Sequence, residues 1–380
     1  MLEIASAEGI YLTDVKGKKY IDLISGIGVS NVGHRHPNVI TAIKDQVDRH
    51  LHTMVYGEFV QNPQVRLAKA LTETLPEELD SVYLVNSGSE AIEGAMKLAK
   101  RFTGRSELIA CHNAYHGSSH GALSLSGSDE FTQNYRPLLP GVGHIRFGNV
   151  DDLESITEKT AAFIVETVQG EAGVSIASLS YWEKVRKKCN ETGTMLILDE
   201  IQCGFGRTGK LWAFEHYGII PDVIVSAKGL GGGMPIGCFI ANRETMNVFT
   251  ENPVLGHITT FGGHPVSAAA SLATLQTIHE EQLLEGIEEK QKRFHDLLVH
   301  PSIKQIRSKG LMIAVEFESY EVLKPIIDRA IDFGIITDWF LFNDRSMRIA
   351  PPLTITLNEI TEACERILEA IDQVEVLDKS

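Results

Sequence analysis

Short runs of apolar, β-branched residues alternate with longer amphipathic segments through the middle of this chain of 380 residues. The clearest runs, which have the length and composition of strands buried on both faces, are residues 108–111, 162–165, 195–198, 223–225 and 238–240. Strand, helix and strand in alternation favour a mostly parallel sheet that helices cover on both sides. The chain is therefore predicted to be an α/β protein built on such a sheet.

Two of the expected helices begin with a recognisable pair of residues. The amphipathic segment 180–189 opens with Ser180 and Glu183, which have the spacing of a capping box. The last helix of the chain opens with a second such pair, Thr356 and Glu359. The apolar stripe expected on this last helix is formed by Ile360, Cys364, Ile367, Leu368 and Ile371.

After residue 268 the alternation gives way to a long, partly charged helical stretch that is predicted to reach residue 298. A small α+β unit follows, with strands at 313–317 and 347–350 and a helix at 320–332. Residues 11–23 also alternate like strands and could join this unit. We therefore expect a large domain of residues 50–267 and a small α+β domain of residues 1–49 and 268–380, which includes the long connecting helix.

The composition argues against several classes of partner. The chain has 35 Lys and Arg against 50 Asp and Glu, a net charge of −15, whereas nucleic acid and anionic membrane surfaces attract clustered positive charge. No apolar run is long enough to span a bilayer, and the first residues do not resemble a secretory signal. The 5 cysteines contain no CxxC pair, so we expect no disulfide framework and a cytoplasmic location.

The sequence NSGSEA, residues 86–91, joins an apolar run to a helical segment. Backbone N–H groups at the start of a helix favour a phosphate, so Ser87, Gly88 and Ser89 are candidate phosphate ligands. The same segment also fits a purely structural role, because Ser87 and Glu90 have capping-box spacing. Taken alone, these residues leave both interpretations open.

Asp199 and Lys228 each follow a predicted buried strand. Asp199 ends the strand 195–198, at the edge of an open α/β sheet where ligands bind, and its carboxylate could keep a cationic ring nitrogen protonated. Lys228 precedes a glycine-rich loop, where partial removal from water would make the amine nucleophilic. Each also has a simpler interpretation, Asp199 as a turn or cap residue and Lys228 as an exposed loop residue.

Tyr115, in the segment 113–124, offers an aromatic face for a planar heterocycle, although it could equally be a loop residue that packs on the core. One ligand requires all four of these groups: a phosphate-binding segment, an aromatic ring that can stack, a carboxylate for a pyridinium nitrogen and a lysine for an aldehyde. That ligand is pyridoxal 5'-phosphate. The combination is far more specific than any of its members.

With these motifs in place, the sequence resembles the class III aminotransferases, a family of pyridoxal-phosphate enzymes of fold type I, and is nearest to the acetylornithine and ornithine group. The resemblance covers nearly the whole chain, and its most specific stretch is residues 198–237, LDEIQCGFGRTGKLWAFEHYGIIPDVIVSAKGLGGGMPIG. It implies the PLP-dependent transferase fold type I, with a mostly parallel central sheet in a large domain and a small domain from both chain ends. It also implies a homodimer with shared active sites.

The resemblance assigns roles to individual residues. Lys228 carries the cofactor as a Schiff base, Asp199 pairs with the pyridine nitrogen, and these two are the predicted catalytic residues. Gln202 contacts the ring hydroxyl, Tyr115 stacks on the ring, and Thr260 reaches the phosphate of the partner subunit. The predicted cofactor-binding residues are Ser87, Gly88, Ser89, Tyr115, His116, Asp199, Gln202, Lys228 and Thr260.

Glu171 and Arg348 match the pair that the family uses to switch between amino donor and oxo-acid acceptor. Ile27 and Ser118 complete the predicted substrate-binding set. Ser118 is a departure, because the ornithine, acetylornithine and aminobutyrate enzymes usually place an arginine at this position. Arg136 is a candidate to replace that arginine.

The switching pair favours transamination, in which an amine or amino acid gives its amino group to a 2-oxo acid such as 2-oxoglutarate by a ping-pong mechanism. An aminomutase or decarboxylase of the same fold type is an alternative. A nicotinamide-dependent dehydrogenase would need a GxGxxG loop, but Met234 takes the place of the third glycine. A metal hydrolase could use His112, His116 and His120, yet the glycines and serines among them make a poor helix.

Overall fold

The computed structural model describes residues 2–54 and 58–378, and its centre is a seven-stranded sheet. The order of its strands is β4 (Ser81–Val85), β10 (Gly237–Ala241), β9 (Val223–Ser226), β8 (Met195–Asp199), β7 (Thr160–Glu166), β5 (Glu107–Cys111) and β6 (Val142–Ile145). Strand β10 runs antiparallel to both of its neighbours, and the other pairings are parallel. The five predicted strands and the mostly parallel sheet are confirmed.

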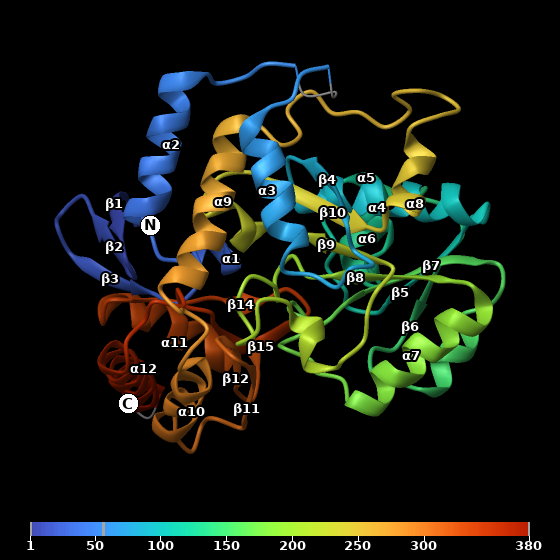
Figure 1. The fold of residues 1–380 in the computed structure, drawn as a ribbon. Helices are drawn as coiled ribbons and strands as arrows, with labels where there is room; N and C mark the ends of the chain where they lie inside the picture. Colours follow the sequence, from blue (N-terminus) through green and yellow to red (C-terminus); the bar gives the residue numbers. More distant parts are fainter. Residues whose placement is uncertain (1, 55–57, 379–380) are drawn as a thin grey trace.

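Helices lie on both faces of this sheet (Figure 1). The longer helices of the chain are α2 (Pro37–Arg49), α3 (Asn62–Thr72), α4 (Gly88–Thr103), α7 (Leu179–Thr192), α9 (Pro265–Glu280), α10 (Ile287–Leu297), α11 (Tyr320–Asp332) and α12 (Leu357–Asp378). Helices α10, α11 and α12 pack in a separate core away from this sheet. The short ones are α1 (Ser25–Gly28), α5 (His120–Ser124), α6 (Asp129–Thr132) and α8 (Arg243–Met246). Within the described residues, no helix is both long and apolar enough to cross a bilayer.

Side chains that alternate along the buried strands divide the core into two clusters, because successive residues of a strand point to opposite faces. Leu196 and Leu198 of β8 lie in a cluster that includes residues of α3, α7 and α9. Met195 and Ile197 of the same strand lie in a second cluster with residues of α4, α5 and α8. The sheet is therefore buried on both faces, as its continuous apolar strands require.

Helix α7 begins earlier than its sequence predicted. Its N-cap is Ser178, whose hydroxyl accepts a hydrogen bond from the backbone N–H of Tyr181 at 3.2 Å. The predicted capping box of Ser180 and Glu183 is wrong. Both Tyr181 and Trp182 are fully buried, so the turn that carries them is already part of the packed helix and the cap must precede it.

The predicted single helix over residues 268–298 is also wrong, because it is two helices, α9 and α10. Gly286, with φ +74°, separates them in a left-handed conformation that suits glycine. Ala268 and Ile278 of α9 lie in the core beside the seven-stranded sheet, whereas Phe294 of α10 lies in a separate core near the C-terminus. The chain therefore turns where it passes from one core to the next. In Figure 1, α9 lies lengthwise beside α2 and α3.

Two smaller sheets complete the fold. One has the order β11 (Gln305–Lys309), β12 (Met312–Glu316), β15 (Asn343–Ile349) and β14 (Trp339–Phe340), and helices α11 and α12 accompany it. The other has the order β1 (Ile4–Glu8), β2 (Tyr11–Asp14), β3 (Lys19–Asp22) and β13 (Ile335–Ile336). The N-terminal strands therefore share a sheet with a strand from the C-terminal region, and Figure 1 shows them beside α11 and α12.

The cap of the last helix is the predicted one. The backbone N–H of Glu359 donates to the Thr356 hydroxyl at 3.2 Å, and the backbone N–H of Thr356 donates to the Glu359 carboxylate at 2.8 Å. This reciprocal pair is a capping box. The apolar stripe faces the core, with Leu368 only partly buried at its edge. The division of the chain at residues 49/50 and 267/268 stays a prediction.

Candidate functional site

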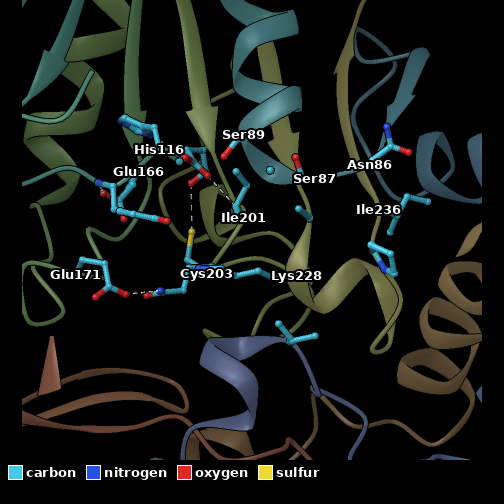
Figure 2. A pocket seen from close by; sticks show the side chains of 18 of the residues that line it. Asn86, Ser87, Ser89, His116, Glu166, Glu171, Ile201, Cys203, Lys228 and Ile236 are labelled. Carbon is cyan, nitrogen blue, oxygen red and sulfur yellow. Dashed lines mark hydrogen bonds and ion pairs between the residues drawn. The ribbon is translucent and has the colours of Figure 1, made fainter. Parts of the chain in front are cut away.

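The carboxyl ends of the parallel strands meet at one edge of the large sheet, and a cavity of about 410 Å³ opens there. Its walls include the last residues of β7 and β8 and the segments that follow β4, β5 and β9. The predicted site residues that line it are Ser87, Gly88, Ser89, Tyr115, His116, Glu171, Asp199, Gln202 and Lys228. In Figure 2, Ser87 and Ser89 lie at the end of helix α4, with His116 and Glu166 on one side and Lys228 across from them.

Four of the predicted residues lie outside this lining. Ile27 and Arg348 line a smaller adjoining cavity that shares Gln202 with the first. Ser118 is exposed, and its hydroxyl lies 3.3 Å from the Tyr115 hydroxyl. Thr260 is exposed on the segment between α8 and α9.

The start of helix α4 has a serine cap and also faces the cavity. The Ser87 hydroxyl caps the helix by accepting from the Glu90 N–H at 3.2 Å. The Glu90 carboxylate does not complete the box on Ser87 but accepts from the backbone N–H of Asn86 at 2.8 Å. Gly88 and Ser89 form the first turn beside the cavity, where helix N–H groups have no partner within the helix. The first backbone N–H groups of α4 therefore face the cavity, the arrangement that favours an anion.

Asp199 and His116 form a buried pair at the end of strand β8. The His116 Nδ1 lies 2.7 Å from Asp199 Oδ2, and the Ile201 N–H donates to Asp199 Oδ1 at 2.9 Å. Burial alone would lower the pKa of His116, but its hydrogen bond to Asp199 and the charge of that carboxylate raise the pKa above its usual value. Asp199 is therefore fixed in direction by two hydrogen bonds rather than free to turn.

Lys228 begins a short helical turn after β9 with φ +45°, a backbone conformation that L-residues rarely adopt. Its Nζ lies 6.0 Å from the centre of the Tyr115 ring, so the two predicted ring-binding residues face the same space. Burial lowers the pKa of the Lys228 ammonium, and the charge of Glu171 opposes this shift. A lowered pKa makes the neutral, nucleophilic amine more accessible.

Glu171 and Arg348 pair through two parallel hydrogen bonds of 2.7 and 3.0 Å, and both side chains are buried. The Gln202 amide also donates to Glu171, at 2.9 Å. Burial alone would raise the pKa of Glu171, but the hydrogen bonds and charge of Arg348 lower it to about 2. The pair predicted from the family resemblance is thus assembled beside Lys228.

Glu166 is a cavity residue that the sequence analysis missed. It ends strand β7 directly opposite Asp199 on β8 and accepts from the backbone N–H groups of Tyr115 at 3.1 Å and Gly170 at 2.9 Å. Burial raises the pKa of its carboxyl to about 7. Its position was a usable signal, because a carboxylate at the end of a buried strand is the same pattern that singled out Asp199.

The three histidines considered for a metal site make separate contacts. His116 pairs with Asp199, His112 lies 3.2 Å from the Gly127 carbonyl oxygen, and His120 lies 2.8 Å from that of Pro137. Over residues 2–54 and 58–378, no group of three or more His, Cys, Asp or Glu side chains is arranged to hold a metal ion. The geometry therefore gives no support to a metal hydrolase.

Comparison with known proteins gives the same picture. The family model described as aminotransferase class-III matches residues 1–371. The acetylornithine aminotransferase of Methanopyrus kandleri is 39% identical over 373 residues, which cover 97% of this chain and 94% of the relative. The putrescine aminotransferase of Pectobacterium atrosepticum is 39% identical over 386 residues, covering 96% and 80%.

A solved structure with the same fold is the ornithine aminotransferase from Toxoplasma gondii, described with partial occupancy of PLP at its active site. It superimposes with a TM-score of 0.93 at 31% sequence identity and covers 100% of this chain and 92% of its own. The predicted fold type is thereby confirmed. The chain is a pyridoxal-phosphate-dependent transaminase acting between an amine and a 2-oxo acid, and it belongs to the class III aminotransferases.

Proposed function

We propose that the cavity at the carboxyl edge of the large sheet binds pyridoxal phosphate, held covalently by Lys228. The observation that carries this proposal is the meeting of Lys228, Asp199 and the start of helix α4 around one space of about 410 Å³. These residues come from three distant parts of the sequence. A structural role for each of them separately would not require them to face one another.

The walls of the cavity fit the cofactor in a second way. The Nε2 atom of His116 is buried without a hydrogen-bond partner among the described residues, so the ring presents a polar atom to the cavity wall. A side chain on Gly117, which has φ +128°, would collide with the Ser89 hydroxyl. The glycine thus allows the loop to approach the phosphate-binding end of α4 closely.

In the proposed mechanism, the bound cofactor supplies an electron sink for negative charge on the substrate carbon that carries the amine. Asp199 holds the cofactor's ring nitrogen protonated, and His116 and the Ile201 N–H keep its carboxylate in place. Once the substrate amine has displaced Lys228 from the cofactor, the freed Nζ would take the proton from the substrate carbon. Burial lowers the pKa of this amine, which favours the neutral form that can accept a proton.

Glu171 and Arg348 let one site accept two kinds of substrate. While Glu171 occupies the guanidinium, the charge of Arg348 is neutralised and an amine without a carboxylate nearby can bind. When Glu171 turns away, the same guanidinium offers two parallel N–H groups to the α-carboxylate of a 2-oxo acid such as 2-oxoglutarate. By the family resemblance we assign Gln202 to the ring hydroxyl. We assign Ile27 to the wall of the substrate site, because it lines the same cavity as Arg348.

The donor side of the site favours amines that lack a remote carboxylate. Arg136, the candidate to replace the missing arginine, pairs with Asp129 and does not line the cavity. Among the described residues of this chain, Lys228 is the one lysine or arginine that lines the main cavity. Ser118 offers a hydroxyl where the family resemblance implies an arginine in the ornithine, acetylornithine and aminobutyrate enzymes. One relative acts on a diamine by name, the putrescine aminotransferase. We infer that the donor is an ω-amine whose far end is uncharged or cationic.

A homodimer in the cytoplasm is the proposed working form. Large apolar side chains are exposed around a hollow of about 630 Å³ between α3 and the segment 254–259. They include Val65, Val254, Leu255 and Ile258. An exposed apolar surface of this kind marks an interaction site, and Thr260 adjoins it. A second copy packed there would bring its Thr260 toward the phosphate.

The covalent link predicts that the purified protein is yellow and that borohydride fixes the cofactor on Lys228. Peptide mapping after reduction is the measurement, and a label on any other lysine would contradict the assignment. Lys228→Ala should lose turnover while its thermal unfolding stays close to that of the wild type. Lys210→Ala, which removes a lysine outside the cavity, is the matched control.

Asp199→Asn should reduce turnover by about 100-fold or more, because a preorganised charge opposite the ring nitrogen is lost. Asp222→Asn is the control, since Asp222 accepts from the Leu196 N–H near the other end of β8. Steady-state rates of both variants at saturating cofactor are compared with the wild type. A loss of less than about tenfold for Asp199→Asn, against the larger effect expected for such a contact, would reject the counter-ion role.

The dimer predicts that two defective subunits complement each other. Lys228→Ala lacks the lysine of its own site, and Thr260→Ala weakens the phosphate contact in its partner's site. A mixed dimer contains one site with both residues intact, so mixing the variants should restore activity at limiting cofactor. Sedimentation at assay concentration should give the mass of a dimer. Failure of the mixture to gain activity, or an active monomer, would refute the shared site.

The serine at position 118 predicts that acetylornithine, ornithine and 4-aminobutyrate are poor donors. A charge-assisted hydrogen bond contributes about 1.5–3 kcal/mol, so its absence should lower the efficiency toward them by about 10- to 100-fold. Putrescine should not suffer this loss. A kcat/KM for acetylornithine near 10⁵ M⁻¹ s⁻¹, roughly the usual range for an enzyme with its own substrate, would overturn the prediction. Ser118→Arg should raise the efficiency toward the carboxylate donors.

A further inference from the structure

The guanidinium of Arg348 has more partners than the switching pair requires. Its Nη1 and Nη2 donate to Glu171, while its Nε donates to Asp338 Oδ1 at 2.8 Å. Nη2 also donates to the carbonyl oxygen of Trp339 at 3.1 Å, and the guanidinium carbon lies 4.5 Å from the centre of the Phe340 ring. Hydrogen bonds along two edges of the guanidinium and the Phe340 ring against one of its faces therefore fix the orientation of its plane.

These partners come from two different parts of the chain. Thr337 and Asp338 join β13 to β14, Trp339 and Phe340 form β14, and β14 pairs with β15, the strand of Arg348. The Arg348 N–H donates to the Asp338 carbonyl oxygen at 2.9 Å, and the Thr337 hydroxyl donates to the Arg348 carbonyl oxygen at 2.6 Å. Glu171 instead belongs to the loop that follows β7. Asp338 thus stays with Arg348 whether or not Glu171 moves.

We propose that Asp338 is a positioning residue that keeps the guanidinium of Arg348 aimed into the site when Glu171 turns away. The inference rests on the proposed function, in which Arg348 receives the α-carboxylate of the oxo acid. With Asp338 in place, the arginine stays still and Glu171 is the part that moves. The α-carboxylate then meets two N–H groups already set parallel, so less orientational freedom is lost on binding.

Removing Asp338 has two opposing effects on the binding of an oxo acid. The guanidinium loses its Nε partner, which frees its orientation and weakens binding. The site also loses a negative charge beside Arg348, which by itself would strengthen the binding of an anion. Asp22 and Glu171 are the other carboxylates that act on Asp338, and they remain in the variant. The loss of positioning therefore predicts weaker binding of the oxo acid, whereas the loss of charge predicts tighter binding, so the change in KM distinguishes the two effects.

The test compares Asp338→Ala and Asp338→Asn in the two half-reactions, each followed by stopped-flow absorbance of the holoenzyme. Asp338→Ala should raise the KM for 2-oxoglutarate by about 10-fold or more, the size expected for a charge-assisted hydrogen bond. Asp338→Asn keeps an oxygen that can accept from Nε, so it retains most of the positioning and its KM should stay within about threefold of the wild type; the weaker neutral hydrogen bond accounts for a rise of that size. The half-reaction with putrescine, which has no carboxylate, should be unchanged in both variants and shows that they are folded.

Two results would overturn the proposal. One is a KM for 2-oxoglutarate that falls or stays unchanged in Asp338→Ala. The other is an equal loss with putrescine and 2-oxoglutarate, which would indicate a general structural role. Asp152→Ala, which removes an aspartate–arginine pair outside the cavity, should change neither half-reaction and is the control.

An Arg348→Lys variant separates this inference from the function on which it rests. If Arg348→Lys leaves the KM for 2-oxoglutarate unchanged, Arg348 does not receive the carboxylate, and the proposed switch fails together with the inference. If Arg348→Lys raises that KM and Asp338→Ala does not, the switch stands and the positioning role of Asp338 alone is wrong. If both raise it while putrescine is unaffected, both stand.

Discussion

Complete burial of the central strands is the constraint on which the rest of the structure depends. Every residue of β7, β8 and β9 is buried, and the backbone groups between their ends are paired with neighbouring strands. Such strands have room for functional polar side chains only at their ends. Because these strands are parallel, their carboxyl ends lie at one edge, which brings Glu166, Asp199 and Lys228 together although they are far apart in sequence.

Concentrating charge at that edge requires a partner for every charged group. Asp199 is held by His116 and a backbone N–H, and Glu166 is held by two backbone N–H groups. Glu171 has Arg348 and Gln202. Within the described residues Lys228 has no ion pair comparable to these, and burial lowers the pKa of its amine, which favours the neutral form that the proposed chemistry needs. The carboxylates of the site are therefore held in place by hydrogen bonds, whereas the Lys228 amine has no partner of similar strength among the described residues.

The sequence was sufficient where a pattern depends on neighbours along the chain. Apolar runs predicted the strands, and the Thr356 and Glu359 pair predicted the start of α12. Local sequence patterns gave wrong predictions where contacts between residues far apart in the sequence determine the structure. The Ser180 pair has the right spacing, but buried aromatic side chains move the cap of α7 to Ser178. Asp338 was missed because its partner Arg348 lies on another strand and nothing adjacent in sequence marks it, whereas Glu166 carried the same strand-end signal as Asp199.

The same distinction bears on the proposal that one arginine serves two substrates without losing its direction. Arg348 has one carboxylate partner on its own small sheet and one on a loop of the large sheet. The Arg348 N–H donates to the Asp338 carbonyl oxygen, which keeps that residue beside the arginine, whereas Glu171 lies on a separate loop and can turn away at the expense of its own hydrogen bonds. Glu171 retains two further donors, Gln202 and the Leu341 N–H, so its release is opposed but local. The incoming α-carboxylate replaces the hydrogen bonds that Arg348 loses, and the exchange is nearly balanced in charge.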